Sequence, residues 1–157
     1  MLYSFNFEKG KYYSSEHKLS ISIPGGWSKL SSQQGILVSY GKLGSGESFL
    51  INFNKIPSNL TIESLNWEKL FYPIYSSLLI EEEGLMLVDG KHFKYCMYEI
   101  IDPSLKKQQE GSYNLKSLAA ISINNSKIYV ITFTDSKDNF NTHYPLFVET
   151  IESIKLD

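Results

Sequence analysis

Paired extended segments joined by tight turns restrict the fold of this chain more than any other feature of its sequence. Asp89-Gly90 lies within such a pair, over residues 81–102, and this dipeptide favours the positive φ angles of a two-residue hairpin turn. Two further hairpins are predicted over residues 36–40 with 48–54 and over residues 112–123 with 127–134. Consecutive hairpins place neighbouring strands antiparallel, so we expect an antiparallel sheet.

Two shorter alternating segments come before these hairpins. Residues 3–7 alternate aromatic and polar side chains, and residues 17–23 place leucine and isoleucine on one face with serine on the other. Pro24-Gly25-Gly26 ends the second segment, because proline lacks an amide donor and glycine permits unusual backbone angles. We expect about six to seven of the extended segments to pair in one sheet.

Residues 61–79 change to a helical period, with apolar side chains at spacings of three and four. Thr61 is the candidate N-cap residue of this helix. Pro73 conflicts with an unbroken helix, where it costs about 3 kcal/mol, so we expect a kink or a break near Tyr72.

A second amphipathic helix is predicted near the end of the sequence. Starting at Phe140, aromatic side chains and isoleucine recur at the positions i, i+4, i+7, i+11 and i+14. Asp135 or Ser136 can cap the start of this helix. Pro145 lies inside the pattern and predicts either a helix that starts later or a kinked one.

Together these elements predict one α+β domain over residues 1–157. The two apolar helical stripes must be buried against the antiparallel sheet, so helices flank it in an α/β/α sandwich. Hydrophobic residues make up 42% of the chain and charged residues 20%. This composition can supply a sizeable core and is not typical of a disordered protein.

The charged residues argue against a nucleic-acid partner. The chain has 15 basic and 17 acidic residues, every basic residue is lysine, and only Lys106-Lys107 are adjacent. Binding to nucleic acids or to a membrane surface needs clustered positive charge, and arginine normally supplies the two-pronged contacts to guanine. We therefore expect neither class of partner.

The sequence predicts a soluble domain without a transmembrane segment, since no stretch reaches the ~20 apolar residues that a spanning helix needs. Its start has no charged region followed by an apolar run, which predicts a cytoplasmic protein. If an N-terminal signal has been trimmed, the prediction changes to an extracytoplasmic protein or a lipoprotein.

We find no catalytic motif and no cofactor motif. The glycine-rich loop from Gly41 to Gly46 leads into a strand, whereas phosphate-binding loops lead into the N-terminus of a helix. We therefore interpret this loop as a hairpin connection. Paired carboxylates for acid–base catalysis are assembled in space, and the sequence leaves them open.

Metal sites and reactive thiols are also not favoured. His92 and Cys96 share one face of a predicted strand, but a strand cysteine is more often buried and unreactive. Glu81-Glu82-Glu83, and Asp135 with Asp138, lack the spacing of a calcium loop. We interpret these carboxylates as a solvated sheet edge and as charges at a helix start.

Several segments resemble one family. Residues 19–27 are similar to the strand and Pro-Gly-Gly-Trp turn that open PsbP-like domains, and residues 89–95 resemble the central hairpin. Residues 127–134, with the apolar positions from Phe140 to Leu156, resemble the last strand and helix. The resemblance covers most of the chain from about residue 17 and rests on core and turn positions.

The family includes the extrinsic P subunit of photosystem II, the Mog-type Ran-binding nuclear import factor and many bacterial proteins. The frequent Lys, Asn, Ile, Ser and Tyr residues fit a bacterial member. The resemblance implies an antiparallel sheet between helices and a non-enzymatic binding or assembly role. It carries over no functional residue, because the matching positions are structural.

Surplus aromatic residues supply the candidate partner-binding positions, which are Tyr12, Tyr13, Phe71 and Tyr72. Tyrosine is enriched at protein interfaces, although such residues also flank ordinary cores. The leading hypothesis is a protein-binding or assembly module with an unidentified partner. The alternatives are a small-ligand carrier or enzyme with a pocket between sheet and helices, and a self-associating structural protein.

Overall fold

The computed structural model describes residues 10–30, 36–42, 48–55, 61–70, 78–100, 115–124 and 127–156. In chain order the strands are β1 (Gly10–Ser14), β2 (Leu19–Ile23), β3 (Trp27–Lys29), β4 (Ile36–Lys42), β5 (Ser48–Lys55), β6 (Leu78–Val88), β7 (Lys91–Ile100), β8 (Leu115–Asn124), β9 (Lys127–Ser136) and β10 (Lys155–Leu156). The helical segments are the 3-10 helix η2 (Ile62–Ser64) and the α-helices α1 (Trp67–Leu70) and α3 (Lys137–Glu152).

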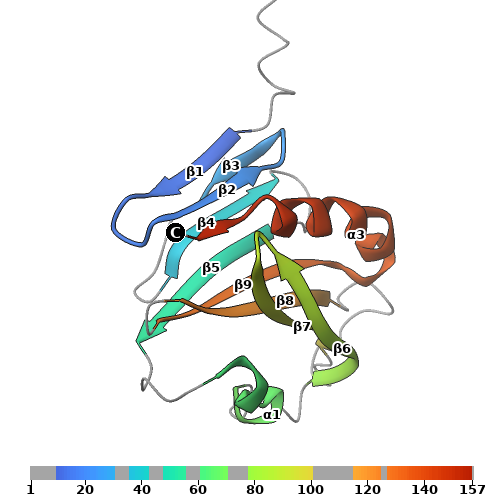
Figure 1. Cartoon of the computed structure of the whole chain (residues 1–157). Coiled ribbons are helices and arrows are strands. Elements are labelled where there is room, and N and C mark those ends of the chain that lie inside the picture. Colours follow the sequence, from blue (N-terminus) through green and yellow to red (C-terminus); the bar gives the residue numbers. More distant parts are fainter. Residues whose placement is uncertain are drawn as a thin grey trace, which may run out of the picture.

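The strands form two antiparallel sheets (Figure 1). The main sheet has the order β3-β4-β5-β9-β8-β7-β6, and the smaller sheet has the order β1-β2-β10. All three predicted hairpins are present, as the pairs β4–β5, β6–β7 and β8–β9. The predicted α+β fold with a sheet of six to seven antiparallel strands is confirmed. The three-stranded sheet was not predicted.

The turn between β6 and β7 has the predicted geometry. Asp89 and Gly90 both have positive φ angles, of 51° and 74°, and Val88 pairs with Lys91 across the turn. Two successive residues in this region match the right-handed twist of the flanking strands. The turn therefore fixes the register of the longest hairpin in the described structure.

One face of the main sheet is covered by α3 and the smaller sheet. The buried stripe of α3, which contains Phe140, Phe147 and Ile151, packs into a cluster with side chains from β7, β8 and β9. The ring of Phe147 stacks on Phe133 at 4.9 Å between centroids and meets Trp27 edge-on at 6.4 Å. Aromatic stacking and burial thus fix α3 on the sheet.

The opposite face carries a second cluster. Ile62, Leu65 and Trp67, from η2 and the start of α1, are buried against this face. Their partners on the main sheet are Cys96, Tyr98, Ala119, Ile121 and Ile128. The helical cover described on this face is two short segments rather than one long helix.

The predicted helix over residues 61–79 is wrong in its extent. Helical structure covers Ile62–Ser64 and Trp67–Leu70, residues 71–77 lie outside the described structure, and Leu78 and Leu79 belong to β6. Leu78 and Ile80 pack on one side of the sheet and alternate with Leu79. Pairing with β7 along the whole strand satisfies one side of the backbone of this segment, which outweighs the helical spacing. The predicted break near Tyr72 lies outside the described residues.

The C-terminal helix is confirmed. Of the two alternatives for Pro145, the late start is wrong and the kinked helix stays a prediction. The helix begins at Lys137, directly after the N-cap residue Ser136, and runs through Pro145 to Glu152 without a late start. Proline removes one backbone hydrogen bond, at a cost of about 3 kcal/mol. Burial of the aromatic stripe on both sides of Pro145 offsets that cost.

The second predicted strand is slightly shorter than expected. β2 begins at Leu19 because Lys18 has a φ angle of 51° and closes the turn from β1. The predicted strand over residues 3–7 lies outside the described residues. Trp27, which follows the Pro-Gly-Gly turn, lies on the terminal strand β3 and is nearly buried.

Replacing Phe147 tests the packing of α3. We expect Phe147→Ala to lower the free energy of unfolding by about 3–5 kcal/mol, because the side chain is fully buried between Phe133, Phe140 and Trp27. Urea unfolding followed by circular dichroism measures the change. The exposed Asn139→Ala on the same helix is the control, with an expected effect below about 0.5 kcal/mol. Equal effects of the two changes would contradict this packing.

Candidate functional site

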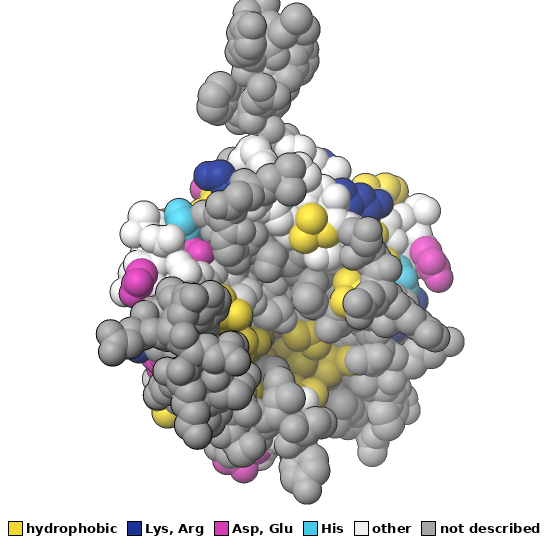
Figure 2. All heavy atoms as spheres, turned by 180° about the vertical axis from the view of Figure 1, so that it is seen from behind, with side chains coloured by type: hydrophobic (Ala, Val, Ile, Leu, Met, Phe, Trp, Pro, Cys, Tyr) yellow, Lys and Arg dark blue, Asp and Glu magenta, His cyan; other side chains and the backbone are white. Residues whose placement is uncertain are grey.

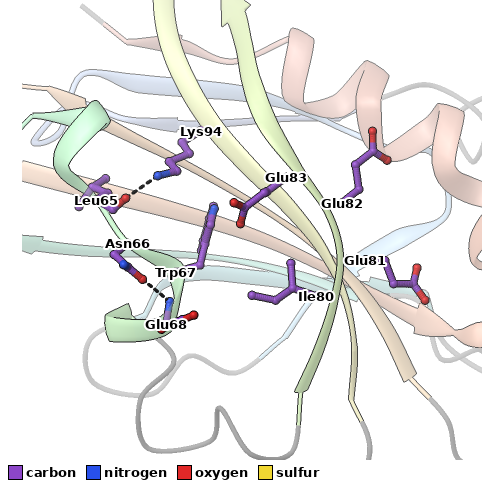
Figure 3. A pocket seen from close by; sticks show the side chains of 9 residues that line it. All are labelled: Leu65, Asn66, Trp67, Glu68, Ile80, Glu81, Glu82, Glu83 and Lys94. Atoms are coloured by element: carbon purple, nitrogen blue, oxygen red, sulfur yellow. Dashed lines mark hydrogen bonds between the residues drawn. The ribbon is translucent and has the colours of Figure 1, made fainter.

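A cleft lies between the η2–α1 segment and strands β6 and β7. Its volume is about 450 Å³. The residues that line it are Leu65, Asn66, Trp67, Glu68, Ile80, Glu81, Glu82, Glu83 and Lys94 (Figure 3). We call this feature the edge cleft, because β6 is the terminal strand of the main sheet.

Local hydrogen bonds shape the wall formed by η2 and α1. The Ser64 hydroxyl donates to the Thr61 carbonyl at 2.8 Å and accepts from the Thr61 amide at 3.2 Å, which closes the first turn. The Asn66 side-chain oxygen accepts a hydrogen bond from the Glu68 amide at 2.8 Å and caps α1. Thr61 lies at the predicted N-cap position, although the helix that it starts is a short 3-10 helix.

Lys94 joins this wall to the sheet. Its ammonium group, which projects from β7, donates a hydrogen bond to the Leu65 carbonyl (Figure 3). A charged donor strengthens such a bond. The same bond ties the η2–α1 segment to β7 and places the positive charge of Lys94 on the backbone of the cleft wall.

A β-bulge between Ile80 and Glu82 changes which face of the sheet each glutamate side chain of β6 points to. Figure 3 shows Ile80 and Glu83 pointing toward Trp67, whereas the carboxylates of Glu81 and Glu82 point away from the cleft. The Glu81 carboxylate forms an ion pair of 2.7 Å with Lys116. Glu83 is therefore the member of the acidic run whose side chain faces the cleft.

Glu82 is held from the other face of the sheet. The Tyr95 hydroxyl donates to the Glu82 carboxylate at 3.3 Å, and burial, followed by this carboxylate, raises the pKa of Tyr95. The Tyr95 ring lies over Gly84, where an added Cβ would come within 3.0 Å of it. A glycine in this edge strand thus leaves room for an aromatic side chain that covers it.

The rest of β6 exposes large apolar side chains. Leu85 and Leu87 are 59% and 65% exposed and lie on the same face of the strand as Glu83. Leu79 is 50% exposed. Three largely exposed leucines on one edge strand are unusual, because a free edge is normally protected from contact with other chains.

A smaller groove continues the edge cleft along β6. It has a volume of about 300 Å³ and is lined by Ile62, Glu63, Glu83, Gly84, Leu85 and Lys94. Glu63 on η2 and Glu83 on β6 therefore border one groove, and Leu85 of β6 also lines it. The groove thus combines apolar side chains with two carboxylates at its border.

Of the sequence-predicted partner residues, Tyr12 and Tyr13 lie outside the edge cleft. Tyr12 is half-buried against the main core, and burial raises its pKa, whereas Tyr13 on the opposite face of β1 is 63% exposed. β1 lies in the smaller sheet, away from β6 (Figure 1). Phe71 and Tyr72 lie outside the described residues. A partner-binding role for these four residues stays a prediction.

The other sequence candidates are separated by the fold. His92 is exposed, but Cys96 is fully buried. Asp135 is buried and accepts hydrogen bonds from the Ser136 amide at 2.7 Å and from His143 at 2.6 Å, so it fixes the start of α3. Within the described ranges, no group of three or more His, Cys, Asp and Glu side chains is arranged to hold a metal ion.

Sequence reasoning kept a pocket between sheet and helices as an alternative but did not place the edge cleft or bring its residues together. Trp67, Glu83 and Lys94 come from three different segments, and no motif joins them. One local signal was present. The run from Leu85 to Val88 is apolar at every position, although three glutamates come shortly before it. A strand with apolar residues on both faces must be covered on both faces or expose one of them.

No sequence-family model matches the chain, and no curated protein matches it by sequence. Among solved structures, cyanobacterial PsbP (CyanoP) of Synechocystis has a TM-score of 0.75 at 15% identity, over 96% of this chain and 94% of that one. The Saccharomyces cerevisiae Ran-binding protein Mog1p has a TM-score of 0.66 at 8% identity, over 96% of each chain. LpqN of Mycobacterium tuberculosis, which is involved in cell envelope biogenesis, has a TM-score of 0.57 at 6% identity, over 95% and 90%.

The chain has the PsbP/Mog-like fold. Similarity over nearly the whole length of three solved structures confirms the family resemblance at the level of fold. Sequence identities of 6–15% do not transfer a function. None of the described helices has the length and apolar character needed to cross a membrane.

The reactivity of Cys96 tests the arrangement of the second cluster. Burial raises the pKa of the Cys96 thiol to about 12, so at pH 8 about one thiol in ten thousand is ionised. We expect a thiol-specific chromogenic reagent to label the folded protein at least about a hundredfold more slowly than the protein in 8 M urea, with the absorbance of the released thiolate as the readout. Cys96 is the single cysteine, so the signal has one source. Equal labelling rates would contradict its burial.

Proposed function

We propose that this chain is a non-catalytic protein-binding or assembly module, and that it docks its partner at the β6 edge. We use this name for the exposed part of β6 from Glu83 to Leu87 with the groove beside it. The observation that carries the proposal is the exposure of Leu85 and Leu87 on a terminal strand. Exposed apolar side chains on a strand edge are typical of interaction sites.

The energetic argument concerns these leucines. Burying one leucine side chain stabilises a complex by about 1.5–3 kcal/mol, and both leucines lie on one face of the strand, two residues apart. A partner that covers both therefore gains a substantial part of its binding free energy at this edge. The Ran-binding neighbour Mog1p shows that the fold is compatible with protein binding, which supports the proposal.

A capture experiment tests the proposal. We expect the tagged protein to retain a specific partner from extracts of its native host, and the double variant Leu85→Ser/Leu87→Ser to lose at least about nine-tenths of it, as a loss of 1.4 kcal/mol or more predicts. Leu30→Ser, which removes an exposed leucine at the end of β3, is the control and keeps the partner. Quantitative mass spectrometry measures the retained protein. Undiminished capture by the double variant would contradict the proposal.

A small-ligand carrier or enzyme is the second candidate. The edge cleft, at about 450 Å³, falls within the usual size of small-molecule sites. Seen from behind, hydrophobic side chains also gather near the middle of that face (Figure 2). Both features favour keeping this alternative beside the protein-binding proposal.

Fluorescence of Trp67 separates the two candidates. Trp67 lines the cleft, and Trp27→Phe leaves it as the single tryptophan. If the cleft takes a small ligand, a metabolite library contains compounds that change this emission by more than about 10% at micromolar concentration. The protein-binding proposal instead expects no such compound. A saturable change that Glu83→Gln abolishes would favour the small-ligand alternative.

The location of the protein stays a prediction. The cytoplasm and an extracytoplasmic site are the two possibilities. LpqN supports the second possibility only through its own role in the cell envelope.

A further inference from the structure

We propose that the partner segment at the β6 edge is an extended strand that pairs with β6 and presents, on one face and at positions two residues apart, a lysine or arginine next to apolar residues. This inference rests on the proposed protein-binding function and names the chemistry of the partner. It follows from three observations, which are the backbone of β6, its exposed leucines and the charges around them.

The backbone of β6 offers a template for another strand. β6 is eleven residues long and terminal in the main sheet, and within the described ranges β7 is the strand that pairs with it. A terminal strand presents a row of amide and carbonyl groups that an extended segment can pair with. Its length permits several backbone hydrogen bonds, more than a short edge strand such as β3 allows.

The side chains of β6 set the apolar half of the pattern. Leu85 and Leu87 lie two residues apart, so they project from one face of the strand. An added strand places every second side chain on that same face, next to them. Apolar residues at these positions of the partner cover both leucines.

The charges around the groove set the other half. Glu63 and Glu83 border the groove together, and both side chains are exposed. Lys94 is the one cation among the residues that line the groove, and its ammonium group already bonds the Leu65 carbonyl. A partner residue that approaches Glu83 is therefore stabilised by positive charge and repelled if it is acidic.

The same charges disfavour a second copy of this chain as the occupant. If β6 paired antiparallel with β6 of a second copy along its full length, Glu83 would face Glu83 of that copy. Like charges directly opposite each other destabilise a strand pair. The glutamates thus protect the edge from self-association while they select a cationic strand.

Three synthetic peptides test the proposal on the intact protein. Each has nine residues with Thr at every second position, so that the other five side chains share one face. On that face the first (the Lys-Val peptide) has Lys at both ends and Val between them, and the second (the Glu-Val peptide) has Glu in place of each Lys. The third repeats the first with N-methyl groups on all its amides. We expect the Lys-Val peptide to bind and to slow amide hydrogen exchange in β6 by at least about tenfold. The Glu-Val and N-methylated peptides are expected to bind at least about tenfold more weakly. Fluorescence anisotropy of labelled peptides measures the affinities.

Matched variants of the protein locate the charge contact. We expect Glu83→Gln with Glu63→Gln to weaken Lys-Val peptide binding about fivefold to tenfold, because two ion pairs are lost. Glu152→Gln, an exposed change of the same charge on α3, leaves the affinity unchanged. Each variant is first checked by thermal unfolding, and either single glutamate variant, with a smaller expected loss, replaces a double variant that does not fold.

The outcomes separate this inference from the proposed function. If Leu85→Ser/Leu87→Ser loses the captured partner but the Lys-Val peptide does not protect β6, strand addition is overturned and protein binding stands. If the Lys-Val and Glu-Val peptides bind equally, or the N-methylated one binds as well as its parent, the inference is overturned. A concentration-dependent dimer in sedimentation that Leu87→Ser abolishes also overturns it, because a second copy then occupies the edge.

Discussion

The burial of the central strands β8 and β9 on both faces is the constraint on which the rest of the structure depends. Ala119, Ala120 and Ile121 are consecutive and fully buried, although successive residues of a strand point to opposite faces. Both faces of the sheet therefore need a cover. α3 and the smaller sheet supply it on one side, and the η2–α1 segment supplies part of it on the other. The small alanine side chains let both covers approach the strands closely.

This two-sided cover weakens toward β6, and the candidate site lies where it does. The short η2–α1 segment reaches β7 through Trp67 and Lys94, but leaves Leu85 and Leu87 exposed. A scaffold with a doubly buried centre holds such an edge in fixed geometry. In the proposed function the leucines supply affinity for another chain, and Glu83 selects among the chains that can bind. The buried central strands thus support the edge strand β6, where the proposed partner contact lies.

The sequence predicts what depends on local pattern and misses what depends on contacts between distant segments. Asp89-Gly90 and the stripe of Phe140 and Phe147 specify a turn and a helix from neighbouring residues alone. The prediction for residues 61–79 failed because Leu78 fits two patterns. It continues the four-residue spacing of the apolar residues before it, as in a helix, and it begins the two-residue alternation of β6. The cleft was beyond prediction, since packing against the main sheet brings Trp67 to Glu83. The exposure of Leu87 likewise depends on where the cover ends.

The pairing of β10 with β2 has a consequence for how the protein is made. Leu156 pairs with Leu19, and the Ser153 hydroxyl accepts a hydrogen bond from the Ser22 amide at 2.9 Å. The smaller sheet therefore cannot close until the ribosome has supplied residues from both ends of the described chain. Until then β1 and β2 can form a hairpin, but α3 does not yet cover the side chains of Leu19 and Ile21. Closing so long a loop is slow, which makes completion of this sheet a late, post-translational step.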